Sequence, residues 1–107
     1  METMTEILAA LAPHAILVGS ASVSDRYGDI DLVVSAKGLK IAKRLFPAGE
    51  SVFPGHWATD ATTAPIEVFR TWYEPMYHRL YRRHRELTER TLYGVTLRAW
   101  PIPTREE

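Results

Sequence analysis

Residues 19–35, GSASVSDRYGDIDLVVS, contain two closely spaced aspartates within a run of apolar β-strand residues. Because successive side chains on a strand point to opposite faces, Asp29 and Asp31 share one face while Ile30 and Leu32 share the other. Burying a carboxylate is costly unless a positive partner neutralises it. The spacing therefore predicts a positively charged partner for the two aspartates.

The size and composition of the chain predict a single globular domain spanning residues 1–107. The chain is 46% hydrophobic and 24% charged, its 13 basic and 13 acidic side chains cancel, and it has no cysteine. Disulfides and thiolate metal sites are therefore excluded. The first residues carry acids rather than the bases of a signal peptide, and no apolar run approaches the roughly 20 residues of a membrane span. We therefore expect a cytoplasmic protein that contacts no membrane.

The order of elements predicts an α/β (α+β) fold, with a small mixed β-sheet flanked by helices. Helical spacing of apolar residues predicts helices at 3–12, 36–46 and about 75–92. Apolar or alternating runs predict strands at 14–19, 29–35, 64–72 and 95–102. Residues 51–59 are predicted as a poor or edge strand, because Pro54 and Gly55 interrupt them.

The aspartate pair is typical of a site for hard cations. Carboxylates at i and i+2 lie about 6.5–7 Å apart along a strand, and they can share Mg²⁺ or Mn²⁺, which take oxygen ligands. Glu67 is the expected third ligand, because Ile66 and Val68 flank it as apolar residues flank the aspartates. Glu50 and Asp60 are weaker candidates because both lie in loop-like sequence.

A phosphate-binding segment is predicted just upstream of the aspartates. Gly19 ends the first predicted strand, where a glycine lets the backbone approach a ligand closely. The N–H groups of residues 20–22, together with the Ser20 hydroxyl, can cradle a triphosphate. Arg26 can contact a phosphate from the following turn.

These residues resemble the motif of the polymerase-β-type nucleotidyltransferase superfamily. LVGSASVSDRYGDIDLVV (17–34) has its hydrophobic residue, Gly-Ser, spacer and Asp-hydrophobic-Asp-hydrophobic order, and PIEVF (65–69) is similar to the family's third-carboxylate strand. The resemblance covers about residues 14–70, and the chain is similar to minimal members, which stop after the last core strand. It departs from the family in having Glu67 where an aspartate is frequent.

The resemblance implies a nucleotidyltransferase-like core and a role for each motif residue. Gly19 and Ser20 would hold the nucleotide phosphates, Asp29 and Asp31 would bind Mg²⁺, and Glu67 would bind the catalytic metal and help to activate the acceptor hydroxyl. The implied reaction transfers a nucleoside monophosphate from a triphosphate such as ATP to a hydroxyl on a protein, RNA or small molecule, and releases pyrophosphate.

A second hypothesis is a non-catalytic module of the same fold, which binds nucleotide, RNA or a partner protein, for example as a toxin–antitoxin component. The three acids favour the enzyme, because a binding module has no reason to keep them without a metal. The basic stripe Arg79–Arg85 is more typical of a solvated helix face, although it could contact triphosphate or RNA. His56 and Trp57 could border the nucleotide base.

Overall fold

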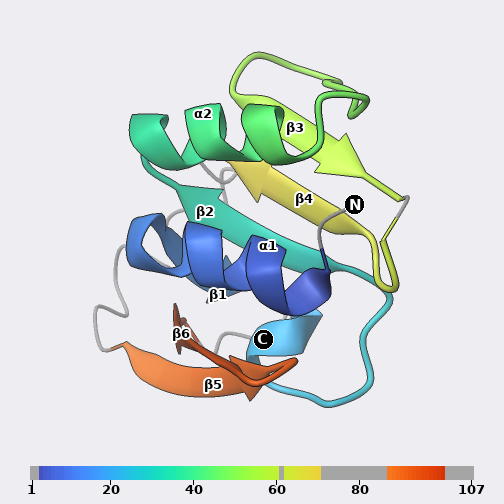
Figure 1. Ribbon diagram of the computed structural model, residues 1–107. Helices are drawn as coiled ribbons and strands as arrows, with labels where there is room; N and C mark the ends of the chain where they lie inside the picture. Colours follow the sequence, from blue (N-terminus) through green and yellow to red (C-terminus); the bar gives the residue numbers. More distant parts are fainter. Residues whose placement is uncertain (1–2, 61, 71–86, 101–107) are drawn as a thin grey trace.

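The computed structural model describes residues 3–60, 62–70 and 87–100, which form a layer of helices on a mixed β-sheet (Figure 1). The α-helices are α1 (Met4–Leu11) and α2 (Ala36–Leu45), and two 3₁₀ turns are η1 (Ala12–His14) and η2 (Ser20–Ser22). The strands are β1 (Ala15–Val18), β2 (Ile30–Val34), β3 (His56–Thr59), β4 (Ile66–Phe69), β5 (Thr88–Leu92) and β6 (Val95–Ala99). The predicted α/β (α+β) class with a small mixed sheet is confirmed.

The strand order, β3-β4-β2-β1-β6-β5, places the two predicted acidic strands next to each other. β2 runs parallel to β4, with Asp31 paired to Glu67, and antiparallel to β1, with Asp31 paired to Val18. β1 runs parallel to β6, and the edge strands β3 and β5 are antiparallel to their neighbours. The register therefore brings Glu67 beside Asp31 although 36 positions separate them in the sequence.

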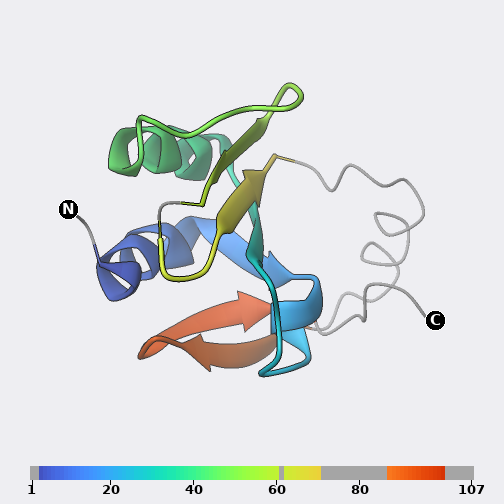
Figure 2. The ribbon, with the colours of Figure 1, turned by 90° about the vertical axis from the view of Figure 1, so that its right-hand side faces the viewer.

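Both helices cover one face of the sheet (Figures 1 and 2). α1 begins with a capping box, in which the Thr3 hydroxyl accepts from the Glu6 N–H and the Glu6 carboxylate accepts from the Thr3 N–H. The buried side of α1 packs on the apolar residues that alternate along the central strands. This core includes Ile7, Leu8, Leu11, Leu17, Ile30, Leu32, Ile66 and Val68.

The other face of the sheet carries the acids and a second apolar cluster. Val18 and Phe69 are buried there, with Val33 packed against them. Asp31 alternates with Ile30 and Leu32 of the helix-facing core, so its carboxylate points to this second face. The predicted division of the strand into an acidic and an apolar side is therefore observed.

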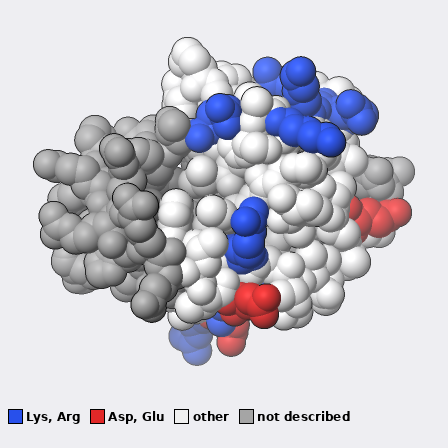
Figure 3. Space-filling model, turned by 90° about the vertical axis from the view of Figure 1, so that its left-hand side faces the viewer, with Lys and Arg blue, Asp and Glu red and all other residues white. Residues whose placement is uncertain are grey.

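The outer side of α2 is strongly basic. The Ser35 hydroxyl caps this helix by accepting from the Gly38 N–H at 3.1 Å. Its exposed cations gather on one region of the surface (Figure 3), and they are Lys37, Lys40, Lys43 and Arg44. Lys43 Nζ lies 5.4 Å from the centre of the Trp57 ring. This strip, the α2 basic strip, lies on the helix side of the molecule.

The predicted end of the third helix is wrong, because residues 88–92 form β5 rather than helix. β5 and β6 make a hairpin through Tyr93 and Gly94, whose φ values of 52° and 79° give the left-handed backbone of a tight two-residue turn. The pattern of alternate burial, with Leu92 and Leu97 buried, is that of strands. The rest of that predicted helix and the Arg79–Arg85 stripe lie outside the described residues.

The strands predicted before the third helix are present but shorter than expected. Gly55 has a φ of 85°, so the backbone turns there and β3 begins only at His56. β3 is an edge strand, as predicted.

Neither helix in the described ranges has the length and apolar character needed to cross a bilayer.

Gly38→Ala tests how closely α2 lies against the sheet. In an open helix this change stabilises by up to about 1 kcal/mol, because alanine has the higher helix propensity. In this helix an added Cβ would lie 2.9 Å from Val34 Cβ and 3.0 Å from His14 Cβ. We expect a loss of about 1–3 kcal/mol in the free energy of unfolding in urea, and less than about 0.5 kcal/mol for Lys40→Ala on the exposed side. A stabilised Gly38→Ala protein would contradict the packing.

Candidate metal centre

Three carboxylates converge on the face of the sheet opposite the helices. Asp29 precedes β2, Asp31 lies within β2, and Glu67 lies beside Asp31 on the parallel strand β4. One carboxylate oxygen from each of the three lies within 4.8 Å of the others, and all three residues are partly buried. Glu50 and Asp60, the weaker candidates, do not belong to this group.

The three acids repel one another in the absence of a cation. Burial, followed by the charges of Asp29 and Glu67, raises the pKa of Asp31 to about 8. Burial, followed by a hydrogen bond to Glu67 and the charge of Glu67, raises the pKa of Asp29 to about 6. The fold therefore disfavours the ionised form of both aspartates, and most strongly that of Asp31. A bound cation would favour the ionised form and so offset this effect.

His56 contacts the third carboxylate directly, which the sequence analysis did not foresee. Its Nε2 lies 2.9 Å from Glu67 Oε1, and its side chain is only 3% exposed against 33% for Glu67. The other ring nitrogen, Nδ1, accepts a 3.0 Å hydrogen bond from the Val52 N–H. Eleven positions separate the two residues along the chain, and the register between β3 and β4 brings them together.

The expectation that His56 and Trp57 border a nucleotide base is not supported by their positions. His56 is buried against Glu67, whereas Trp57, its neighbour on β3, points to the opposite face. There the Trp57 Nε1 donates to the Phe46 carbonyl oxygen at 3.0 Å, at the end of α2. Alternation along β3 separates the two side chains, so they do not form one wall.

Gly19 lies directly against the acidic group. Its φ is 74°, and a Cβ added there would lie 2.7 Å from Asp31 Oδ2. Any other residue would be strained by the backbone and would collide with the carboxylate. Ser20 follows as the first residue of η2, and the first N–H groups of a 3₁₀ turn have no acceptor within that turn. The predicted phosphate segment and the predicted metal ligands are therefore adjacent.

An arginine from the far edge of the sheet holds the loop that joins these two parts. Arg90 of β5 donates to the Ser24 carbonyl oxygen and to Asp25 Oδ1, each at 3.0 Å, and to the Ala21 carbonyl oxygen at 3.3 Å. The sequence analysis missed this role because it placed Arg90 in a helix. Arg26, the predicted phosphate contact, lies exposed in the same loop, and its side chain has no hydrogen bond to another described residue.

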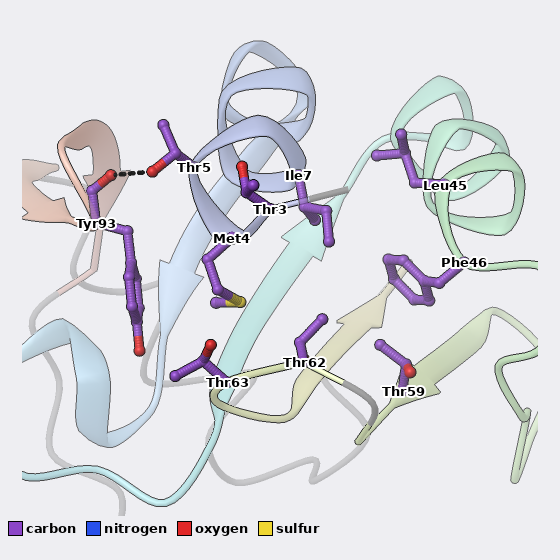
Figure 4. Close-up of a pocket in the computed structure, with 10 residues that line it drawn as sticks. All are labelled: Thr3, Met4, Thr5, Ile7, Leu45, Phe46, Thr59, Thr62, Thr63 and Tyr93. Carbon is purple, nitrogen blue, oxygen red and sulfur yellow. Dashed lines mark hydrogen bonds between the residues drawn. The ribbon is translucent and has the colours of Figure 1, made fainter. Parts of the chain in front are cut away.

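A pocket of about 530 Å³ opens on the helix side of the sheet, between the start of α1, the end of α2 and the β5–β6 turn (Figure 4). Its lining includes apolar side chains such as Met4 and Phe46, several threonines, and Tyr93. No carboxylate is among the described residues that line it. The pocket is thus separate from the acidic group on the opposite face.

Comparison of the chain with protein-family models, with curated proteins and with solved structures found no match.

The raised carboxyl pKa values predict an unusual pH dependence of stability. Burial raises the pKa of Asp29 and Asp31 above the ordinary 3.8, so the folded state holds more protons than the unfolded state between about pH 4 and about pH 8. Their contribution to stability is therefore fully present below about pH 4, and it is lost as the pH rises through about 6 for Asp29 and about 8 for Asp31. Mg²⁺ should recover part of this loss, with a larger rise in Tm at pH 8 than at pH 5.

Asp31→Asn should remove much of this dependence. The neutral amide relieves the repulsion, so we expect the metal-free protein to gain about 1 kcal/mol or more at pH 8, the free energy of a tenfold change in proton affinity. Thermal unfolding at pH 5 and pH 8 measures the effect, and the exposed Asp60→Asn is the control. A variant that is less stable than wild type at pH 8 would show Asp31 to be a structural acceptor instead.

Proposed function

We propose that the chain is a cytoplasmic, Mg²⁺-dependent nucleotidyltransferase, which moves a nucleoside monophosphate from a triphosphate to a hydroxyl acceptor and releases pyrophosphate. The observation that carries this proposal is the convergence of Asp29, Asp31 and Glu67 next to the Gly19–Ser20 turn. In the motif that the sequence resembles, these positions bind the metals and the phosphates. The fold brings the three carboxylates and the Gly19–Ser20 turn together from three separate segments of the chain.

The acidic group fits a hard divalent cation. All three donors are carboxylate oxygens, which suit Mg²⁺ or Mn²⁺ better than softer metals. Their elevated pKa values indicate that nearby protein charges do not compensate the negative charge. The backbone at Gly19 lies close to the acidic group as well, since a Cβ added there would lie 2.7 Å from Asp31 Oδ2.

In the proposed reaction the acceptor oxygen bonds to the α-phosphorus while the bond from that phosphorus to the bridging oxygen breaks, and pyrophosphate leaves. A bound divalent ion would polarise the phosphoryl group and lower the pKa of the acceptor hydroxyl. Asp29 and Asp31 would hold the ion, and the Gly19–Ser20 backbone with Arg26 would orient the phosphates. Glu67 would orient the acceptor hydroxyl beside the aspartates.

The second candidate remains a non-catalytic module that binds RNA, nucleotide or a partner protein, such as a toxin–antitoxin component. The α2 basic strip favours it, because four exposed cations with no ion pair recorded to a described residue suit a polyanion or an acidic surface. The strip lies on the opposite side of the sheet from the carboxylates. It is therefore also compatible with an enzyme whose acceptor is carried by RNA or by a partner protein.

Metal and nucleotide should bind together and only poorly alone. The carboxylates need the cation to offset their repulsion, and the triphosphate bridges the cation to the Gly19–Ser20 turn. Calorimetry with ATP, CTP, GTP and UTP, each with and without Mg²⁺, measures this coupling. Absence of binding for all four at millimolar levels would exclude the nucleotide proposal. Labelled triphosphates incubated with total cell RNA and with lysate then identify the acceptor class.

Glu67→Gln separates binding from transfer. The amide oxygen can still accept from His56 Nε2, so we expect the fold to persist. Mg-triphosphate should still bind, about 10–100-fold more weakly, because one metal ligand has lost its charge, and transfer at saturating Mg-triphosphate should fall by about 100-fold or more. Glu50→Gln, an exposed acid outside the group, is the matched control and should transfer at the wild-type rate. A Glu67→Gln protein that transfers as fast as wild type would remove Glu67 from the mechanism.

A further inference from the structure

We propose that His56 is a positioning residue for Glu67, held as the Nε2–H tautomer so that it fixes one carboxylate oxygen and leaves the other for the cation. This inference rests on the proposed metal-dependent function. It adds a residue that lies outside the family motif which the sequence resembles.

The two ring nitrogens of His56 have defined and opposite roles. Nδ1 lies 3.0 Å from the Val52 nitrogen, and a backbone N–H can only donate, so Nδ1 must be the unprotonated acceptor. Nε2 therefore carries the hydrogen and donates to Glu67 Oε1 at 2.9 Å. An imidazolium has no acceptor nitrogen and would lose the Val52 bond. The backbone thus selects the neutral tautomer that points its donor at Glu67.

The ring is also held in place by aromatic packing. The Phe53 ring stacks on it with centroids 4.7 Å apart, and the Phe69 ring lies 5.3 Å away. With 3% exposure, the imidazole has little freedom to rotate away from Glu67. A buried polar ring whose two nitrogens are both satisfied is a rigid support for its partner.

The strand register explains how the ring reaches Glu67. β3 and β4 pair His56 with Phe69 and Ala58 with Glu67, so His56 is a diagonal neighbour of Glu67 on the same face. The residue directly opposite Glu67 is the small Ala58, which leaves room for the imidazole to cross. Glu67 accepts from His56 through Oε1, on the side that faces β3.

The consequence is that Glu67 presents a single orientation to the aspartates. Carboxylates that bind metals are themselves oriented by hydrogen bonds, and loss of such a partner costs about 10–100-fold in metal affinity. Without the His56 donor, the Glu67 side chain can rotate about its terminal bonds and no longer presents a fixed oxygen to Asp29 and Asp31.

The test combines a tautomer measurement with a rescue series. In the metal-free wild type, ¹⁵N NMR of the His56 ring should show a protonated Nε2 and an unprotonated Nδ1. His56→Leu keeps similar bulk without a donor. It should lower Mn²⁺ affinity, measured by calorimetry or EPR with a non-hydrolysable nucleoside triphosphate present, by about 10–100-fold. His56→Gln returns an N–H near the Nε2 position and should recover most of that loss. A purely structural role would lower the Tm of both variants without this difference in affinity.

A second pair of variants leaves the ring intact. Val52 is 82% exposed, so Val52→Pro removes its N–H with little loss of packing, while Val52→Ala keeps that N–H. Val52→Pro should shift His56 away from the pure Nε2–H tautomer and weaken Mn²⁺ binding several-fold, and Val52→Ala should match the wild type. This pair decides the question if His56→Leu does not fold.

The two possible failures are distinguishable. A wild-type protein that does not bind Mn²⁺ even with a non-hydrolysable nucleoside triphosphate present would overturn the metal proposal itself, and the positioning role with it. A wild-type protein that binds Mn²⁺, together with a His56→Leu variant that binds it equally well, would overturn only the role of His56. An Nδ1–H tautomer or a doubly protonated ring in the metal-free wild type would also overturn that role.

Discussion

The cost of gathering three carboxylates on one face of a small sheet governs the rest of this structure. Asp29, Asp31 and Glu67 bring oxygens within 4.8 Å of one another, and the elevated pKa values of the aspartates show that the fold opposes their full ionisation. The opposite sides of the same strands are occupied by the apolar core beneath the helices, so the acids cannot turn inward. A divalent cation between the carboxylates would offset both their repulsion and the cost of burying them.

The residues around the acids have supporting roles that follow from the same constraint. Gly19 gives Asp31 room that a Cβ would occupy, and Arg90 fixes the loop between them through the carbonyl oxygens of Ala21 and Ser24. His56 holds Glu67 from the edge strand. Each of these contacts comes from a different element, so the site depends on the sheet order rather than on any single segment.

The central part of the fold and its acidic group could be predicted from the sequence, because local patterns determine them. Alternation of Asp29 and Asp31 with apolar residues predicted their shared face, and the same pattern around Glu67 predicted its orientation. The His56–Glu67 bond could not be predicted, because it depends on the register between β3 and β4. Apolar periodicity alone predicts a helix that ends near Leu92. Residues 88–92 form a strand instead, because they pair with β6 in a hairpin that turns through Tyr93 and Gly94, and apolar periodicity does not reveal such pairing.

The most direct measurement of the central claim is the position of the ion itself. Crystals grown with Mn²⁺ and a non-hydrolysable nucleoside triphosphate allow the metal to be located by its anomalous scattering. The account predicts a peak between Asp29, Asp31 and Glu67, with the phosphates against Gly19 and Ser20. Nucleotide bound elsewhere, or clear density for the three carboxylates with no ion between them at saturating Mn²⁺, would contradict it.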